Sequence, residues 1–297
     1  MNDFSANFLR CAAAALIAGL ALADAARAQA APAPTLSPSP VPSPLASPAA
    51  PAGVADPCAS LSTLVSRPTF STATCAVKPA NLLVETGYTN TTASGAGASN
   101  LVSYPQASLR VGAAHNLEFD LNPESIARLS GNPRITGTTD SAIGAKYEIG
   151  YTSRLVYGVN VLYTLSTGNG PFTGNGDGIL ANVNAGLTLS PAFGLFGTLG
   201  YNEQSAGTDA APARYHNFQP SLGASLALPQ GFNVFLEGFN LSSTGPGLGG
   251  RFGYDAGFQK DIGSRLQLDF NYFNYLGIQN GSHLHSIGFG AAYLIGS

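Results

Sequence analysis

The sequence has little charge and no long apolar run. Only 10% of its 297 residues are charged, whereas ordinary soluble domains carry about 25%. A surface built from these residues would be poorly hydrated. A membrane-spanning helix needs an apolar run of about 18 residues, and the sequence contains none. If the chain enters a bilayer, it must do so as β-strands, because only helices and closed barrels satisfy every backbone polar group in lipid.

Two further absences bear on partners and on membrane contacts. The net charge is −3, with no basic excess to bind phosphates, so we expect no nucleic-acid partner. Tryptophan, which is common at membrane interfaces, is absent. The 16 phenylalanines and 12 tyrosines would therefore form the aromatic girdles of a barrel, and the 36 glycines suit many strands and tight turns.

The first residues are typical of an export signal. Arg10 precedes the apolar stretch Cys11–Leu22, and small-residue cleavage sites follow near Ala28 and Ala30. We expect residues 1–28 to be removed, taking Cys11 with them. Residues 29–57 are then predicted to be an extended linker rich in Pro, Ala and Ser, because nine of the 20 prolines lie between residues 31 and 57.

Cys58 and Cys75 are the two cysteines left in the exported chain. In an oxidising compartment they predict a disulfide, which would stabilise the fold by about 3 kcal/mol through loop closure. A metal site would need more ligands, and no histidine is near in sequence, so we expect no metal and no cofactor. Residues 58–78 are predicted to form a stapled segment, with a short helix, at or inside a barrel mouth. The sequence leaves open whether this segment plugs the lumen.

Residues 79–297 alternate apolar and polar side chains in about twelve strand-length stretches, an even count as in bacterial barrels. Tight connections are predicted near 114–115, 152–153, 191–192, 229–231 and 262–263. Long ones are predicted near 91–101, 123–139, 167–178, 203–214, 242–250 and 278–282. Short and long connections alternate, as periplasmic turns and external loops do. The predicted fold is therefore an all-β, up-and-down, antiparallel transmembrane barrel of about twelve strands, preceded by a disordered Pro-rich segment.

The two faces of the strands differ in chemistry. Side chains such as Tyr157, Val159 and Leu268 would contact lipid, and their polar neighbours would face the lumen. The charged side chains in the lumen phase are Glu85, Arg110, Glu118, Asp120, Lys146, Glu148, Glu237, Arg251, Asp255, Arg265 and Asp269. One interpretation is that they are ion pairs bracing the wall. The other is a polar pore whose acidic excess favours cations or neutral polar solutes.

Size and small residues also bear on a pore. About eight strands fill a barrel interior with side chains, and 16 to 18 leave a wide channel, so about twelve predict a narrow passage. Many lumen-phase positions are glycine, including Gly112, Gly158 and Gly290. They would leave room for a solute, although glycine also lets strands bend.

Short motifs resemble the meta-pathway phenol-degradation family. They are SLRVG at 108–112, NLE at 116–118 and DSAIGAKY at 140–147, and the likeness extends over about residues 80–295. The resemblance implies a bacterial outer-membrane-type barrel, a transport role and a link to aromatic catabolism, without a substrate. The last strand, Gly288–Ile295, also resembles the signal read by the barrel-insertion machinery, but the chain ends in Gly296–Ser297 and lacks the terminal aromatic residue.

The sequence thus predicts an exported protein of the bacterial outer membrane that contacts the lipid bilayer and passes a small solute. Aromatic or other small organic compounds are the candidate solutes. A structural or adhesive barrel without transport is the alternative. A barrel lipid hydrolase fits less well. Neighbours such as Ser282 and His283 in one strand face opposite sides, so they cannot pair as nucleophile and base. We therefore expect no enzymatic activity.

Overall fold

The computed structural model describes residues 56–95, 98–130, 134–206, 212–276 and 282–296. The predicted export signal and nearly all of the predicted linker lie outside the described residues, and both stay predictions. No helix among the described residues has the length and apolar character needed to cross a membrane.

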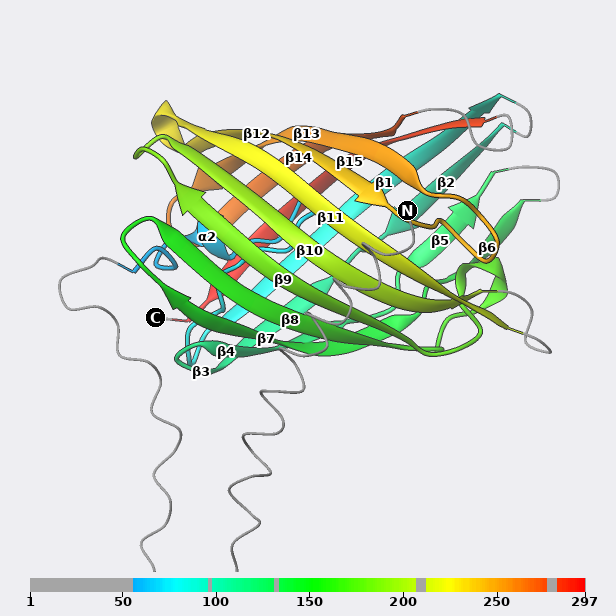
Figure 1. Cartoon of the computed structure of the whole chain (residues 1–297), viewed down its shortest axis with the longest axis horizontal. Coiled ribbons are helices and arrows are strands. Elements are labelled where there is room, and N and C mark those ends of the chain that lie inside the picture. The colour runs from blue at the N-terminus through cyan, green and yellow to red at the C-terminus, as the bar shows by residue number, and fades with distance from the viewer. Residues whose placement is uncertain (1–55, 96–97, 131–133, 207–211, 277–281, 297) are drawn as a thin grey trace, which may run out of the picture. The chain divides into compact units, whose positions relative to one another are not determined.

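Fifteen strands form one antiparallel sheet in which β15 pairs with β1, so the sheet closes into a 12-stranded barrel (Figure 1). The predicted fold class is confirmed. The helical elements of the described residues are α2 (Leu61–Leu64) and two 3-10 turns, η1 (Gly170–Phe172) and η2 (Pro229–Gly231). The strands are β1 (Leu82–Gly95), β2 (Ser99–Tyr104), β3 (Ser108–Ala114), β4 (Leu117–Asn122), β5 (Ile126–Leu129), β6 (Ile135–Thr138), β7 (Ser141–Tyr151), β8 (Leu155–Leu165), β9 (Gly178–Thr188), β10 (Phe193–Ala206), β11 (Ala213–Leu228), β12 (Phe232–Leu241), β13 (Arg251–Ile262), β14 (Leu266–Tyr275) and β15 (Ser282–Ile295).

Three of the barrel strands are interrupted, which reconciles fifteen strands with a barrel of 12. Along β1, Leu82–Glu85 pairs with β3 and Thr89–Ala93 pairs with β2. Similar breaks separate β4 from β5 and β6 from β7. Proline has no N–H to donate to a ladder, so Pro105 and Pro123 account for two of the breaks.

Short and long connections alternate along the sheet, as predicted. The tight turns at 115–116, 152–154, 189–192, 229–231 and 263–265 lie at the end of the barrel where β1 starts and β15 stops. We refer to this end as the short-turn rim. The opposite end, the long-loop rim, carries the connections at 96–98, 130–134, 166–177, 207–212, 242–250 and 276–281.

Three predicted long loops are shorter than expected because the strands continue into them. β1 and β2 pair as far as Ala93 and Ser99, β10 and β11 pair as far as Ala206 and Ala213, and most of the predicted loop 123–139 is the β5–β6 hairpin. The prediction ended each strand where apolar alternation ended. Backbone pairing continues there between polar residues, because the ladder hydrogen bonds join main-chain groups whatever the side chain.

The apolar face of the barrel points outward. Tyr157 is 38% exposed and Leu268 is 43% exposed, whereas Lys146 and Asp269 are 1% and 5% exposed. A soluble sandwich would show the reverse, with apolar side chains in a dry centre. The outer wall is thus suited to hydrocarbon, and the ionised groups are enclosed.

Residues 56–78, which we term the inner segment, run inside the barrel (Figure 1). A disulfide joins Cys58 to Cys75, as predicted. Helix α2 buries Leu61 and Leu64 in an apolar cluster that includes Leu83 of the wall. Hydrogen bonds join the inner segment to β1 and β4 and also to β9 and β12, on the far side of the ring. The inner segment therefore crosses the lumen.

Candidate functional site

Wall carboxylates hold the middle of the inner segment through its backbone. Glu85 accepts hydrogen bonds from the N–H groups of Ser66 at 3.2 Å and Arg67 at 3.0 Å. Glu237 accepts from the N–H groups of Phe70 at 2.9 Å and Ser71 at 3.1 Å, and from the Ser71 hydroxyl. An ionised carboxylate can only accept, and a buried N–H must donate, so each pairing satisfies both groups.

The last part of the inner segment, at Ala76 and Val77, is held in the same way. Glu118 accepts from the Val77 N–H at 2.6 Å, and Glu148 accepts from the Ala76 N–H at 3.4 Å. Charge-assisted hydrogen bonds of this kind are about twice as strong as neutral ones. Four of the predicted lumen carboxylates therefore face protein backbone rather than an open aqueous channel.

Neutral amides and one ion pair complete the attachment. Gln259 donates its side-chain N–H to the carbonyl of Arg67 at 2.8 Å, and Asn271 donates to the carbonyl of Pro68 at 3.1 Å. The Arg67 guanidinium lies 3.4 Å from the carboxylate of Asp269. Every one of these contacts between the inner segment and the wall is non-covalent.

A buried ion cluster lies between the barrel wall and the part of the inner segment around Cys75. The guanidinium of Arg110 is 2.7 Å from Glu85 and 2.8 Å from Glu118, and it also donates to the carbonyl of Cys75 at 3.2 Å. The ammonium of Lys146 is 3.0 Å from Glu118. Asp120 is more distant, 3.9 Å from Arg110. Each buried charge in this cluster thus has an opposite charge beside it, as enclosure requires.

Strand register brings these charges together. Arg110 in β3 is directly opposite Asp120 in β4, and Glu118 in β4 is directly opposite Lys146 in β7. Directly opposed residues in antiparallel strands share a face, with their Cβ atoms about 4.5–5.5 Å apart. The lumen phase of each strand was readable from the sequence, whereas the register between strands was not.

Aromatic rings from the wall and the inner segment stack in the lumen. Phe70 lies parallel to Phe239 with centroids 4.3 Å apart, Phe239 stacks on Phe273 at 4.7 Å, and Tyr275 meets Phe273 edge to face at 5.0 Å. This stack was not predicted from the sequence. The signal was present, because Phe239 is two residues from Glu237, and Phe273 and Tyr275 are in phase with Asp269.

A cavity of about 460 Å³ lies on the long-loop side of this stack. Phe70 and Tyr275 line it together with residues of β10 to β13, of the β12–β13 connection and of β15. Its other lining residues are Asn202, Gln204, Tyr215, Asn217, Gln219, Leu241, Ser243, Thr244, Leu248, Arg251 and Leu284. Pockets of about 300–1,000 Å³ are typical of small-molecule sites. The lumen thus holds a solute-sized space bounded by the inner segment.

Comparison with solved structures gives the same architecture. An outer membrane channel from Pseudomonas putida F1 superposes with a TM-score of 0.61 at 13% identity, covering 77% of this chain and 100% of that one. The NanC porin superposes with a TM-score of 0.50 at 10% identity, covering 70% and 98%. The fold is that of an outer-membrane barrel. No family model and no curated protein matches the sequence.

Nine of the predicted site residues are buried with side chains in the barrel interior: Glu85, Arg110, Glu118, Lys146, Glu148, Glu237, Arg251, Asp255 and Asp269. The carboxylate of Asp120 also faces inward and is 8% exposed. Arg265, placed in the lumen by its phase, is instead exposed in the β13–β14 turn, because the strand ends before it. A role of these residues in lining an open pore stays a prediction.

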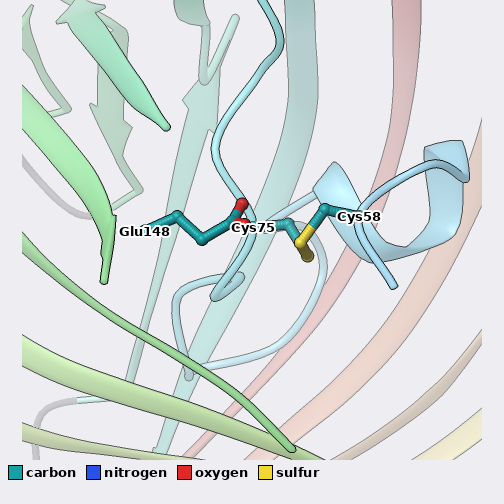
Figure 2. A group of neighbouring side chains, drawn as sticks. All are labelled: Cys58, Cys75 and Glu148. Atoms are coloured by element: carbon teal, nitrogen blue, oxygen red, sulfur yellow. A yellow bond between two sulfur atoms is a disulfide. The ribbon is translucent and has the colours of Figure 1, made fainter. Parts of the chain in front are cut away.

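The disulfide and Glu148 form the group that most resembles a metal site in the described residues (Figure 2). The carboxylate of Glu148 lies beside Cys75. A cysteine binds metal as a thiolate, and both sulfurs are already joined to each other. One carboxylate then remains, which also accepts from Ala76, so the residues do not fit a metal ion.

The lumen glycines leave room for the inner segment. A Cβ atom on Gly112 would lie 2.0 Å from the carbonyl oxygen of Lys78, and one on Gly158 would lie 3.1 Å from that of Thr74. The predicted space for a solute is, at these two positions, occupied by the backbone of the inner segment.

Gly112→Ala is expected to lower the free energy of unfolding by about 1–3 kcal/mol, because overpacking forces backbone to shift. Urea titration of the refolded barrel measures this loss. Gly150→Ala is the matched control, since its Cβ atom would meet only the Tyr157 side chain, whose hydroxyl oxygen lies nearest at 3.5 Å. Equal stability of the two variants would contradict a close fit of the inner segment.

Proposed function

We propose that this protein is a channel of the bacterial outer membrane for small organic solutes, aromatic compounds among them, and that its inner segment holds it closed. The observation that carries the proposal is a solute-sized cavity in a polar lumen, bounded by a segment that, apart from the chain leading into β1, only non-covalent contacts attach to the wall. Both cysteines belong to the inner segment, so the disulfide adds no covalent link between that segment and the wall.

The outer wall supports a membrane location. Apolar side chains cover it, and the tight turns gather at one rim as periplasmic turns do. We propose that the short-turn rim faces the periplasm, that residues 1–28 direct export, and that the insertion machinery reads β15. The link to aromatic compounds comes from the resemblance to the phenol-degradation family, with which the ring stack at Phe70 is compatible.

Solute flux tests the proposal. Liposomes that contain the variant without residues 58–78 are expected to take up a radiolabelled aromatic solute faster than liposomes that contain the whole protein or no protein, and to lose this advantage when the barrel is heat-unfolded. If neither the whole protein nor a variant without the inner segment moves solutes or ions, the structural or adhesive alternative replaces transport. Release of fatty acid from the liposomes, abolished by His283→Ala, would instead support a lipid hydrolase.

A further inference from the structure

The luminal cavity carries a single type of charge. Its lining side chains are amides, hydroxyls and apolar groups, with one exception, Arg251 at the start of β13. Among the residues that the structure describes, no aspartate or glutamate lines this cavity. The acidic side chains of the lumen lie elsewhere, where the inner segment, Arg110 and Lys146 engage them. The wall as a whole has more acidic than basic side chains, but the charged side chain that lines the cavity is basic.

Arg251 has no counter-ion in the part of the chain that the structure describes. Its side chain is buried, with the residue 8% exposed, and its Nη1 atom is enclosed without a hydrogen-bond partner. The contact that positions it is the face of the Tyr275 ring, 5.4 Å from the guanidinium carbon. Arg110, by contrast, lies beside three carboxylates. An enclosed cation without a partner is costly, and an anion entering the cavity would relieve that cost.

The remaining lining defines the rest of the ligand. Phe70 presents a ring already ordered by its stack on Phe239, and Leu241, Leu248 and Leu284 add apolar surface. Aromatic rings pack well on such a surface in offset or edge-to-face geometry. A guanidinium binds a carboxylate through two parallel N–H donors, which fixes its orientation as well as its charge.

We propose that the cavity binds an aromatic monocarboxylate, with the carboxylate on Arg251 and the ring against Phe70. The inference rests on the proposed function in one respect, because it names the class of solute that the proposed channel would carry. Binding itself requires the cavity and Arg251, and it can be measured without transport.

Calorimetric titration of the whole folded protein in detergent tests the site, with benzoate as the probe and benzamide as its neutral analogue. Benzoate is expected to bind more tightly than benzamide or acetate. Arg251→Gln should weaken benzoate binding by about tenfold or more, since a hydrogen bond to a charged group is worth about 1.5–3 kcal/mol. Benzamide binding should not change. Arg251→Lys, which keeps the charge but loses the two-pronged geometry, should give an intermediate affinity.

Arg265→Gln is the matched control, because it removes the same charge from an exposed turn, and it should leave benzoate binding unchanged. Heat-modifiable migration on gels verifies that each variant is folded. Equal affinity for benzoate and benzamide, no binding of benzoate, or no difference between Arg251→Gln and Arg265→Gln would overturn the inference. Arg251-dependent binding without solute flux would uphold the site and reject the channel. Solute flux without Arg251-dependent binding would uphold the channel and reject the site.

Discussion

Deletion of residues 58–78 is expected to turn a closed barrel into one that conducts ions in discrete steps. The inner segment crosses the lumen and engages wall groups on opposite sides, including Glu85 and Glu237. Without it, water can hydrate these carboxylates, because twelve strands enclose more space than the eight whose side chains fill the interior. Planar-bilayer recording of the whole protein and of the deletion variant measures the change.

A matched control separates this effect from shortening of the chain. Deletion of residues 31–55, which precede the inner segment, should leave the barrel closed. Both variants must show the heat-modifiable migration of a folded barrel before they are compared. A folded variant that lacks residues 58–78 and conducts no better than the whole protein would show that another part of the chain closes the lumen.

Arg110→Met is expected to lower the free energy of unfolding by about 3–5 kcal/mol, the cost of leaving buried charges without their partner. Glu85 and Glu118 would lose an ion pair each, and the carbonyl of Cys75 would lose a donor. Urea unfolding of the barrel in lipid or detergent measures the loss.

Arg265→Met is the control for this substitution, because Arg265 is exposed and should contribute less than about 0.5 kcal/mol. In the double variant Arg110→Met with Glu118→Gln, the loss should be smaller than the sum of the two single losses, since the residues contact each other. A loss below about 1 kcal/mol for Arg110→Met would show that water already hydrates this cluster.

The candidate site was predictable in part. The alternation around Lys146 and Glu148 identified inward positions. The disulfide was predicted because Cys58 and Cys75 are the two cysteines that follow the predicted export signal. Arg265 was misplaced because phase alone does not show where a strand ends. The ring stack of Phe70 and Phe239 was not predicted because it joins residues 169 positions apart, one of them outside the barrel wall.

The sequence by itself determined the closed antiparallel barrel, its alternate short and long connections, and the outward direction of its apolar face. The barrel and its connections follow from local periodicity and turn chemistry, which each strand carries in its own residues, and the outward direction follows from these together with the low charge content of the chain. Only the tertiary structure decided that the inner segment crosses the lumen, that Glu85, Glu118 and Glu237 bind its backbone, and that Arg251 has no counter-ion among the described residues. Such partnerships depend on register and on contacts between residues distant in sequence, and no local pattern records them.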